Sequence, residues 1–304
     1  MRGIVAFVAS VACSLTSAFA EDYVMDACPL RNHNPFLQVF GLPKFQTAEL
    51  VRPDHFDFAL GYDIANDADD AERPASELVI DGEMQTLSLS LRRRVFDRME
   101  LGIDVPYISH SGGTLDGLIK NWHNLLGYSN SMRDGPNDQI QHSYAQDGIT
   151  YSELSSAESG IGDIQLSAAY AMQQVTLRGG VKLPTGDPDK LTGSGATDFS
   201  LGFYAGNTTT LFNRAFDYSG FLGILVLGDG DVMPEFQRSS VAYGGLGLRW
   251  HGTERFALSM QWSLQSSYFD IDIDEIGGST IQFAIGGDYR FKRSLLRLAI
   301  VEDV

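Results

Sequence analysis

Residues 98–108, RMELGIDVPYI, alternate large apolar side chains with polar or small ones. One face carries Met99, Leu101, Ile103, Val105 and Tyr107, and the other carries Glu100, Gly102 and Asp104. Alternation with a period of two predicts a β-strand, because successive side chains of a strand point to opposite faces. The two faces of this strand therefore meet different surroundings.

The same alternation recurs through most of the chain and predicts an all-β protein. We count roughly eleven strands, many near the length of about 9–11 residues that a tilted strand needs to cross a bilayer. They cover residues 55–66, 84–92, 98–108, 163–173, 175–184, 197–206, 216–228, 239–251, 255–269, 280–291 and 294–302. Alternation alone also fits a soluble sandwich, whose polar faces meet water.

The connections favour a membrane barrel over a sandwich. Long acidic connections span residues 67–77, 109–159, 185–196, 228–238 and 270–279. Between them lie shorter, partly basic ones at residues 92–98, 173–174, 251–254 and 291–294, with 207–215 of middling length. Strict alternation of the two sets is typical of an antiparallel outer-membrane barrel with short periplasmic turns and long external loops. Aromatic side chains near strand ends fit interfacial girdles: Tyr107, Tyr128, Tyr204, Trp250, Tyr268, Phe269, Tyr289 and Phe291.

The number of strands raises a question of parity. Bacterial single-chain barrels have an even number of strands, so we expect about 12, of which about 11 are visible. The last strand of such a barrel would then be missing from the sequence, or the count is short by one. Residues 35–45, PFLQVFGLPKF, are the alternative partner, but a strand there would put the N-terminus outside.

The N-terminal residues have the pattern of a secretory signal peptide. One basic residue, Arg2, precedes an apolar run that ends in Ala18-Phe19-Ala20, which predicts cleavage between Ala20 and Glu21. A lipoprotein with Cys13 as its acylated residue is the less favoured alternative. We therefore expect a signal peptide at 1–20 and a single barrel domain at 21–304 in the cell outer membrane, with 21–50 as a periplasmic or lumenal segment.

Composition narrows the partners and cofactors. The chain has 39 acidic and 22 basic residues and a net charge of −17, which argues against binding nucleic acid through counterion release. After the predicted cleavage only Cys28 remains, so neither an intramolecular disulfide nor a cysteine metal cluster can form. We expect no cofactor. The expected partners are outer-membrane lipids and lipopolysaccharide, the barrel assembly machinery and a small-molecule ligand.

Four motifs carry a resemblance to a known family. They are PLRNHNPF at 29–36, SHSGGTLDGLIKNWHNLLGY at 109–128, GIGDIQL at 160–166 and KLPTGDPDKLTGSGATD at 182–198. Together they resemble a Gram-negative outer-membrane family described as a domain of unknown function. The paired G-x-GD and K-x-PTGD elements are more loosely similar to channel-like outer-membrane proteins for uptake of hydrophobic or aromatic compounds. The family resemblance implies one more strand after residue 304 and implies no activity.

The leading functional hypothesis is a narrow channel or transport protein for small, possibly hydrophobic, molecules. Thr114 is an expected N-cap, and residues 115–126 carry apolar side chains at helical spacing, which predicts a short amphipathic helix at about 114–127 in the longest loop. This helix can constrict the barrel mouth, pack on the rim or lie at the lipid interface. The candidates for ligand contact or constriction are His110, Gly112, Gly113, Asp116, Trp122, His123, Lys182, Thr185 and Asp187.

Two other functional classes stay open. A lipid hydrolase would use His110 with Ser109 or Ser111, oriented by Asp116, but adjacent residues of a strand point to opposite faces and cannot share one site. A structural or adhesive surface barrel without a pore is the third class. Calcium sites are conceivable at Asp187, Asp189 and Asp198 and at Asp229, Asp231 and Glu235, although neither loop has the twelve-residue calcium signature, so solvated turn residues are favoured.

Overall fold

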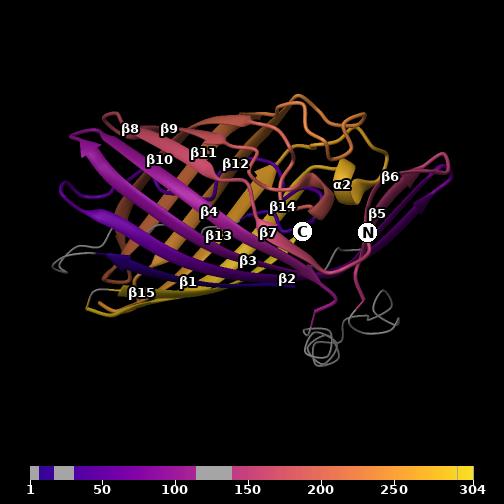
Figure 1. Cartoon of the computed structure of the whole chain (residues 1–304). Coiled ribbons are helices and arrows are strands. Elements are labelled where there is room, and N and C mark those ends of the chain that lie inside the picture. Colours follow the sequence, from indigo (N-terminus) through magenta and orange to yellow (C-terminus); the bar gives the residue numbers. More distant parts are fainter. Residues whose placement is uncertain (1–6, 17–30, 114–138, 293, 304) are drawn as a thin grey trace, which may run out of the picture.

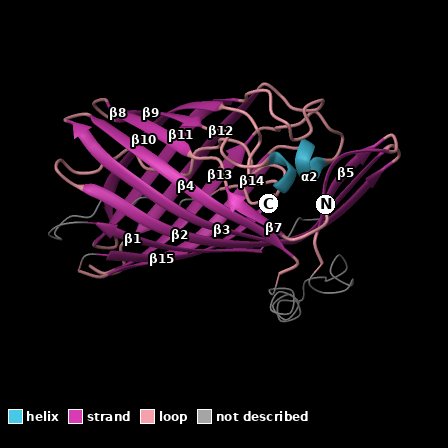
Figure 2. Cartoon of the chain, in the orientation of Figure 1, coloured by secondary structure: helices cyan, strands magenta, loops and turns pink. Residues whose placement is uncertain are grey.

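The computed structural model describes residues 7–16, 31–113, 139–292 and 294–303 (Figure 1). Twelve strands pair side by side in antiparallel fashion as a barrel (Figure 2). They are β1 (Phe7–Thr16), β2 (Phe56–Arg73), β3 (Ser76–Phe96), β4 (Met99–Ser111), β8 (Gln165–Ala171), β9 (Val175–Lys182), β10 (Asp198–Leu211), β11 (Arg214–Val226), β12 (Ser240–Trp250), β13 (Phe256–Gln265), β14 (Thr280–Arg290) and β15 (Ser294–Asp303).

The strand order explains how the wall is assembled. The pairings lead from β3 through β2, β1 and β15, then down the chain order from β14 to β8 and on to β4. β4 in turn pairs with β3, from Glu83 opposite Ser111 to Phe96 opposite Met99. β1 fills the place between β2 and β15 and coincides with the predicted signal peptide, which stays a prediction. Without β1 the remaining strands form a sheet that is open between β2 and β15.

All eleven segments expected from alternation are strands, namely β2 to β4 and β8 to β15. The alternative strand at residues 35–45 is wrong. That segment instead contains a turn, because the Asn34 side chain accepts a hydrogen bond from the Phe36 N–H and the Asn34 carbonyl accepts one from Gln38. A side chain that binds the backbone two residues ahead favours a turn over an extended strand.

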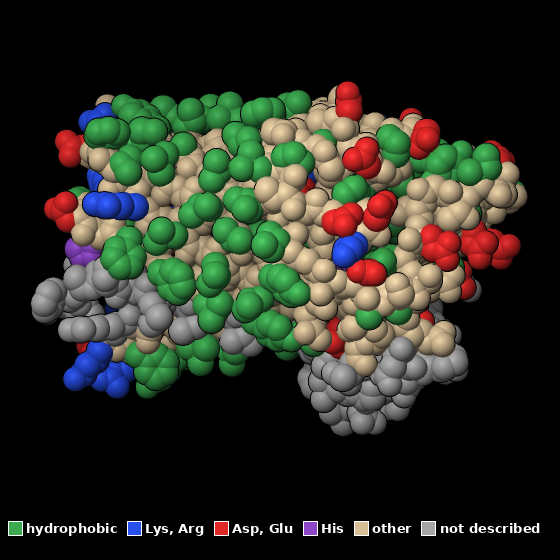
Figure 3. All heavy atoms as spheres, viewed as in Figure 1, with side chains coloured by type: hydrophobic (Ala, Val, Ile, Leu, Met, Phe, Trp, Pro, Cys, Tyr) green, Lys and Arg blue, Asp and Glu red, His purple; other side chains and the backbone are tan. Residues whose placement is uncertain are grey.

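The two faces of the wall carry opposite side chains. Leu87 and Leu89 are 43% and 44% exposed, whereas Ser88 between them is 3% exposed. Figure 3 shows apolar side chains spread over the outside of the strands. A soluble protein buries its apolar side chains, so this reversed arrangement is that of a barrel whose outer face meets lipid. In the described residues, no helix has the length and hydropathy for crossing a membrane.

The connections define two ends. Short turns join β3 to β4, β8 to β9, β10 to β11, β12 to β13 and β14 to β15, and we call this the short-turn end. The opposite, long-loop end holds the 3-10 turn η2 (Pro188–Lys190) and the helical turn α2 (Asp274–Gly277). In the view of Figure 3, basic side chains gather at the short-turn end on the left and acidic ones at the long-loop end on the right.

Two predicted loops are partly strand, and those expectations were wrong. Residues 67–77 continue β2 and β3 in register up to Arg73 opposite Ser76. The segment 109–159 contains β5 (Gln141–Gln146), β6 (Ile149–Leu154) and β7 (Glu158–Ile161). β5 pairs with the start of β3, so the extended hairpin gains a partner on its open edge and forms the arm at the right of Figure 1. The predicted helix at 114–127 lies outside the described residues.

Candidate functional site

Residues 31–52, here called the lumenal segment, run through the barrel from the long-loop end to the short-turn end. The upper part packs into an apolar cluster at the long-loop end, the mouth cluster, which includes Phe36, Val39, Phe40, Leu78, Ile80, Tyr144, Leu191, Met233, Tyr268, Phe269 and Ile276. The Phe40 ring stacks on Tyr268 with centroids 5.0 Å apart and meets Phe269 edge-on at 5.5 Å. Loops and lumenal segment therefore share one core that covers this end of the barrel.

Farther down, Phe45 packs against the inner wall. Its ring meets Phe221 of β11 edge-on, with centroids 4.7 Å apart. On β12, a Cβ added to Gly247 would lie 3.0 Å from the Phe45 ring, so the wall leaves room for this ring by lacking a side chain there. The cluster around Phe45 contains Ala65, Ala284 and Ala299 from three other strands. Small inward-facing residues of the wall thus leave the space that the Phe45 ring occupies.

Lys182, at the end of β9, is the centre of a buried charged cluster. The side chain is 1% exposed, and its Nζ lies 2.7 Å from Asp163 Oδ2 and 3.2 Å from Asp198 Oδ2. The ammonium also donates to the carbonyl of Val39 at 3.1 Å and to the Ser194 hydroxyl. One lysine thereby joins two carboxylates, a loop hydroxyl and the backbone of the lumenal segment.

The two carboxylates extend this cluster to the backbone. Asp163 accepts hydrogen bonds from the N–H groups of Gly186 at 2.8 Å and Ser194 at 3.1 Å. Asp198 accepts from Gly41 of the lumenal segment at 2.8 Å and from Gly228 at 3.0 Å. The GIGD, KLPTGD and LTGSG motifs are separated in the sequence but contribute to one hydrogen-bond network, which also binds the backbone of residues 39–41.

A second cluster, nearer the short-turn end, holds the lower part of the segment. Arg178 of β9 pairs with Glu100 of β4 at 2.9 Å, and both side chains are buried. The guanidinium also donates to the carbonyls of Thr47 at 3.1 Å and Glu49 at 2.8 Å. Glu100 accepts from the Val51 N–H at 2.6 Å. Since both wall charges bind backbone groups, they fix the path of residues 47–51.

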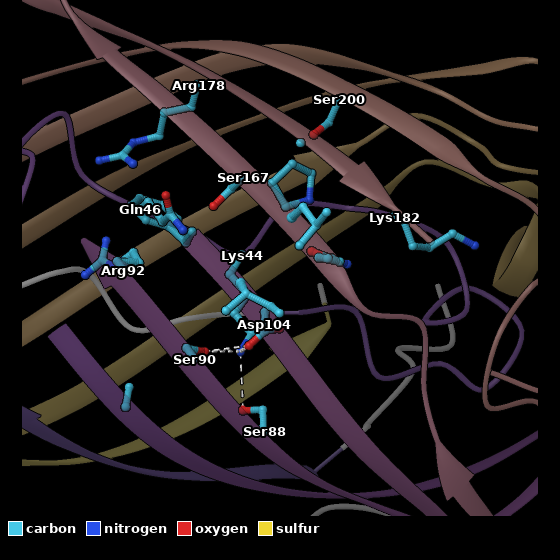
Figure 4. A pocket seen from close by; sticks show the side chains of 18 of the residues that line it. Lys44, Gln46, Ser88, Ser90, Arg92, Asp104, Ser167, Arg178, Lys182 and Ser200 are labelled. Atoms are coloured by element: carbon cyan, nitrogen blue, oxygen red, sulfur yellow. Dashed lines mark hydrogen bonds and ion pairs between the residues drawn. The ribbon is translucent and has the colours of Figure 1, made fainter. Parts of the chain in front are cut away.

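Between these clusters lies a cavity of about 130 Å³ that is lined by both polar and apolar side chains (Figure 4). Lys44 of the lumenal segment reaches across it to Asp104 Oδ1 at 2.7 Å, with Ser88 at 3.2 Å and Ser90 at 3.3 Å. The wall around it is built from small inward residues, including Gly61, Ser88, Ser167, Gly180 and Ser200. Small side chains in facing positions keep this level of the barrel from being filled by the wall itself.

A second cavity of about 260 Å³ lies at the short-turn end, beneath residues 47–49. Strands β10 to β13 supply its wall. Here His251 Nε2 lies 2.6 Å from Asp217 Oδ2, and the Thr208 hydroxyl donates to the same carboxylate at 2.8 Å. Ser219, Arg249, Ser259 and Gln261 complete the inward polar lining.

The structure gives His110 a structural setting. The side chain is fully buried at the end of β4, its Nε2 lies 3.1 Å from the Leu191 carbonyl, and its ring meets His142 edge-on at 5.7 Å. Within the described part of the chain, no hydrogen bond joins His110 to Ser109 or Ser111. Ser111 is paired in register with Glu83. The hydrolase constellation is therefore not assembled by these residues.

Other predicted site residues have local roles. Gly113, following Gly112 at the end of β4, has a φ of +83°, and an added Cβ would lie 2.4 Å from Glu83 Cβ, so only glycine fits there. Thr185 accepts from the Ile164 N–H at 2.9 Å and donates to the Gly162 carbonyl at 2.8 Å. Asp187 caps η2 by accepting from the Asp189 N–H at 3.0 Å. Asp116, Trp122 and His123 lie outside the described residues.

The acidic residues considered for calcium are dispersed in the described structure. Asp189, Asp229, Asp231 and Glu235 are exposed, while Asp198 is buried against Lys182. Among the residues that the structure describes, no three His, Cys, Asp or Glu side chains are placed to share a metal ion. Asp187 and Asp198 thus have intramolecular partners of their own.

Of the wall residues that hold the lumenal segment, only Lys182 was expected from the sequence as a ligand or constriction residue. Arg178, Glu100 and Asp104 were missed. A signal existed, since Glu100 and Asp104 are four apart on one strand, as are Arg178 and Lys182. In a barrel, charges with this spacing on the polar face point into the same part of the lumen.

Comparisons with known proteins give distant structural likenesses. The COG4313 outer membrane channel from Pseudomonas putida F1 is 12% identical, with 99% of this chain and 96% of that chain covered and a TM-score of 0.39. The toluene transporter TodX of P. putida is 10% identical, with 100% and 89% covered and a TM-score of 0.35. No curated protein matches the sequence.

A family model covers nearly the whole sequence. The model of DUF3187, described as a protein of unknown function, matches residues 4–304. This chain therefore belongs to the DUF3187 family.

Proposed function

We propose that this protein is a narrow outer-membrane channel for small solutes that is closed by its own lumenal segment. The observation that carries the proposal is how residues 31–52 are attached. Lys182, Arg178 and Glu100 bind their backbone through separate polar contacts, with one cavity beside residue 44 and another beneath residues 47–49. A lumen filled by a removable segment, rather than by wall side chains, can open.

The attachments of the segment set the cost of moving it. No part of residues 31–55 is a strand, so leaving the lumen breaks no β-ladder. Each charge-assisted hydrogen bond from the wall contributes about 1.5–3 kcal/mol, and each neutral one about 0.5–1.5 kcal/mol. Breaking a wall strand would instead cost a whole row of ladder bonds at once. Leaving the lumen also exposes buried apolar side chains of the segment, among them Phe36, Phe40 and Phe45, so opening costs this apolar packing as well as the hydrogen bonds.

The lining favours small polar solutes as cargo. Hydroxyl, carboxylate, ammonium and guanidinium groups line the cavity beside Lys44, together with apolar side chains such as Phe45 and Leu295. A hydrocarbon in this cavity would desolvate these groups without replacing their hydrogen bonds, which is unfavourable. Hydrophobic cargo is thus supported by the resemblance to uptake channels alone. Outer-membrane lipids, lipopolysaccharide and the barrel assembly machinery are the partners of a barrel in this role.

Planar-bilayer recording tests the proposal. Deleting residues 31–52 removes the obstruction, and we expect wild type to show small or rare conductance steps and the deletion a several-fold larger conductance. Arg178→Met loses the hydrogen bonds to the carbonyls of Thr47 and Glu49, so this variant should open more often than wild type. Arg238→Met is the matched control, because Arg238 pairs with Asp270 between two long loops.

The two competing functional classes, a barrel without a pore and a lipid hydrolase, predict different results. A structural barrel without a pore would stay silent in all three variants even when correctly folded, and that outcome would overturn the proposal. A lipid hydrolase would lose phospholipid turnover on His110→Ala. Unchanged conductance on deletion of the segment would show that residues 31–52 do not close the lumen.

A further inference from the structure

The cavity at the short-turn end is lined on its inward side by polar groups from four strands. Asp217 and Ser219 come from β11, Arg249 from β12 and Gln261 from β13, while Thr208 of β10 braces Asp217. The roof is the backbone of residues 47–49, which Arg178 holds in place. At about 260 Å³ the cavity is just below the roughly 300 Å³ at which pockets for larger ligands begin, so it suits one small molecule.

The charges in this cavity are already paired within the protein. Asp217 binds His251 at 2.6 Å, and Arg249 lies 3.3 Å from Asp288 of β14. A charged solute entering here would have to compete with these intramolecular partners and give up its own hydration, which is costly. A neutral solute does not carry that penalty.

The side-chain oxygen of Gln261, in the lining of the cavity, has no hydrogen-bond partner among the residues that the structure describes. Gln261 is 2% exposed. A buried amide oxygen without a hydrogen-bond donor is destabilising by about 1–3 kcal/mol. Such an atom is therefore expected to accept a hydrogen bond from a bound molecule or water. An amide both donates and accepts, as do the neighbouring hydroxyls of Ser219 and Ser259, and this mixture matches solute hydroxyl groups.

We infer that the cavity between residues 47–49 and strands β10 to β13 binds a small, uncharged, hydroxyl-rich solute through Gln261. The inference rests on the proposed channel function and deepens it, because the site lies in the lumen next to the end of the closing segment. A solute bound there contacts the roof and the wall together. The solute would lie in the lumen at the short-turn end, next to residues 47–49 of the lumenal segment.

Binding is measured on the purified full-length barrel in detergent, by calorimetry, without any bilayer. Glucose is the neutral probe, gluconate and glucosamine are matched probes with one negative and one positive charge, and toluene is the apolar probe. We expect glucose to bind with one-to-one stoichiometry and better than the other three. Gln261→Leu should weaken glucose binding about tenfold, as expected for losing one buried hydrogen-bonding partner.

Gln265→Leu is the matched control, because Gln265 is also a buried inward glutamine of β13 but lies outside the cavity lining. We expect it to change glucose affinity less than twofold. Both variants are first shown to be folded by the heat-dependent shift in electrophoretic mobility typical of barrels. No binding of glucose, equal binding by Gln261→Leu, or preference for a charged or apolar probe would each overturn the inference. Conductance of the segment deletion is recorded separately, so a failed site leaves the channel proposal standing.

Discussion

Replacing Lys182 by methionine should loosen the upper half of the lumenal segment. The lysine side chain is 1% exposed and forms ion pairs with Asp163 and Asp198, whose side chains are 5% and 0% exposed. Removing one partner of a buried ion pair is destabilising by about 3–5 kcal/mol, because the remaining charge has lost its counterion. We expect the lower end of this range, since each carboxylate keeps two backbone N–H donors.

Native-state hydrogen exchange followed by mass spectrometry measures this cost locally. A loss of about 3 kcal/mol accelerates exchange by roughly two orders of magnitude, and we expect this in residues 36–42 and 183–197. Adding Asp198→Asn should restore part of the protection by removing one uncompensated carboxylate. Lys190→Met is the control in the same loop, because its pair with Glu158 is 3.4 Å long and exposed, and such pairs contribute about 0–1 kcal/mol. Equal exchange in the Lys182 and Lys190 variants would refute the reasoning.

Three further predictions concern the arm, the lumen and processing. The pKa of His142, in the arm beyond the barrel wall, is lowered from 6.5 to about 3 by burial and then by neighbouring His110. The folded arm therefore binds fewer protons than the unfolded one, so its stability is full above pH 6.5 and falls between pH 6.5 and about 3. Limited proteolysis at about pH 7 and about pH 4.5, above and within this range, should show faster cleavage in acid, and His142→Leu should remove the difference. Gly180→Val should lower the conductance of the segment deletion by filling the cavity beside Lys44, whereas Gly179→Val, on the lipid-facing side, should not. Finally, N-terminal sequencing of protein purified from outer membranes should begin at Glu21, and an intact leader would contradict the cleavage prediction.

Alternation identified the wall because a lipid-facing strand has no other way to arrange its side chains. Leu87, Leu89 and Leu91 of β3 are exposed, as are Leu101, Ile103 and Tyr107 of β4, and this alternation can be read without knowing the neighbours of either strand. The strands of the arm were not predicted in this way. Residues 67–77 are acidic, which suggested a solvated loop, yet they continue the β2–β3 ladder, and β5 pairs with residues 76–81 of β3 from 60 to 70 residues later along the chain. Pairing over such a separation leaves no local signal.

The site was predicted only in part for a similar reason. Lys182, Thr185 and Asp187 stood out as a motif, but the motif does not say what its charges bind. Arg178 and Glu100 were visible as inward charges on two strands, while their true partners are carbonyl and N–H groups of residues 47–51. Backbone groups are the same in every sequence, so a side chain that binds them carries no matching residue to search for. The sequence left a periplasmic and a lumenal position open for residues 21–50, and the contacts that hold residues 31–52 could be seen only in three dimensions.

The attachments of the lumenal segment differ in kind along its length. Residues 36–40 pack with apolar loop side chains, whereas Lys44 and the backbone of residues 47–51 bind charged groups on β4 and β9. Gly41 lies between the two halves, and its N–H binds Asp198, the carboxylate that also faces Lys182. Because the lower contacts are buried, salt in the medium screens them little, and ionic strength alone should not release them. The upper half is controlled by the loops and the lower half by the wall, so the Lys182 cluster is the point through which a change in the loops can reach the lumen.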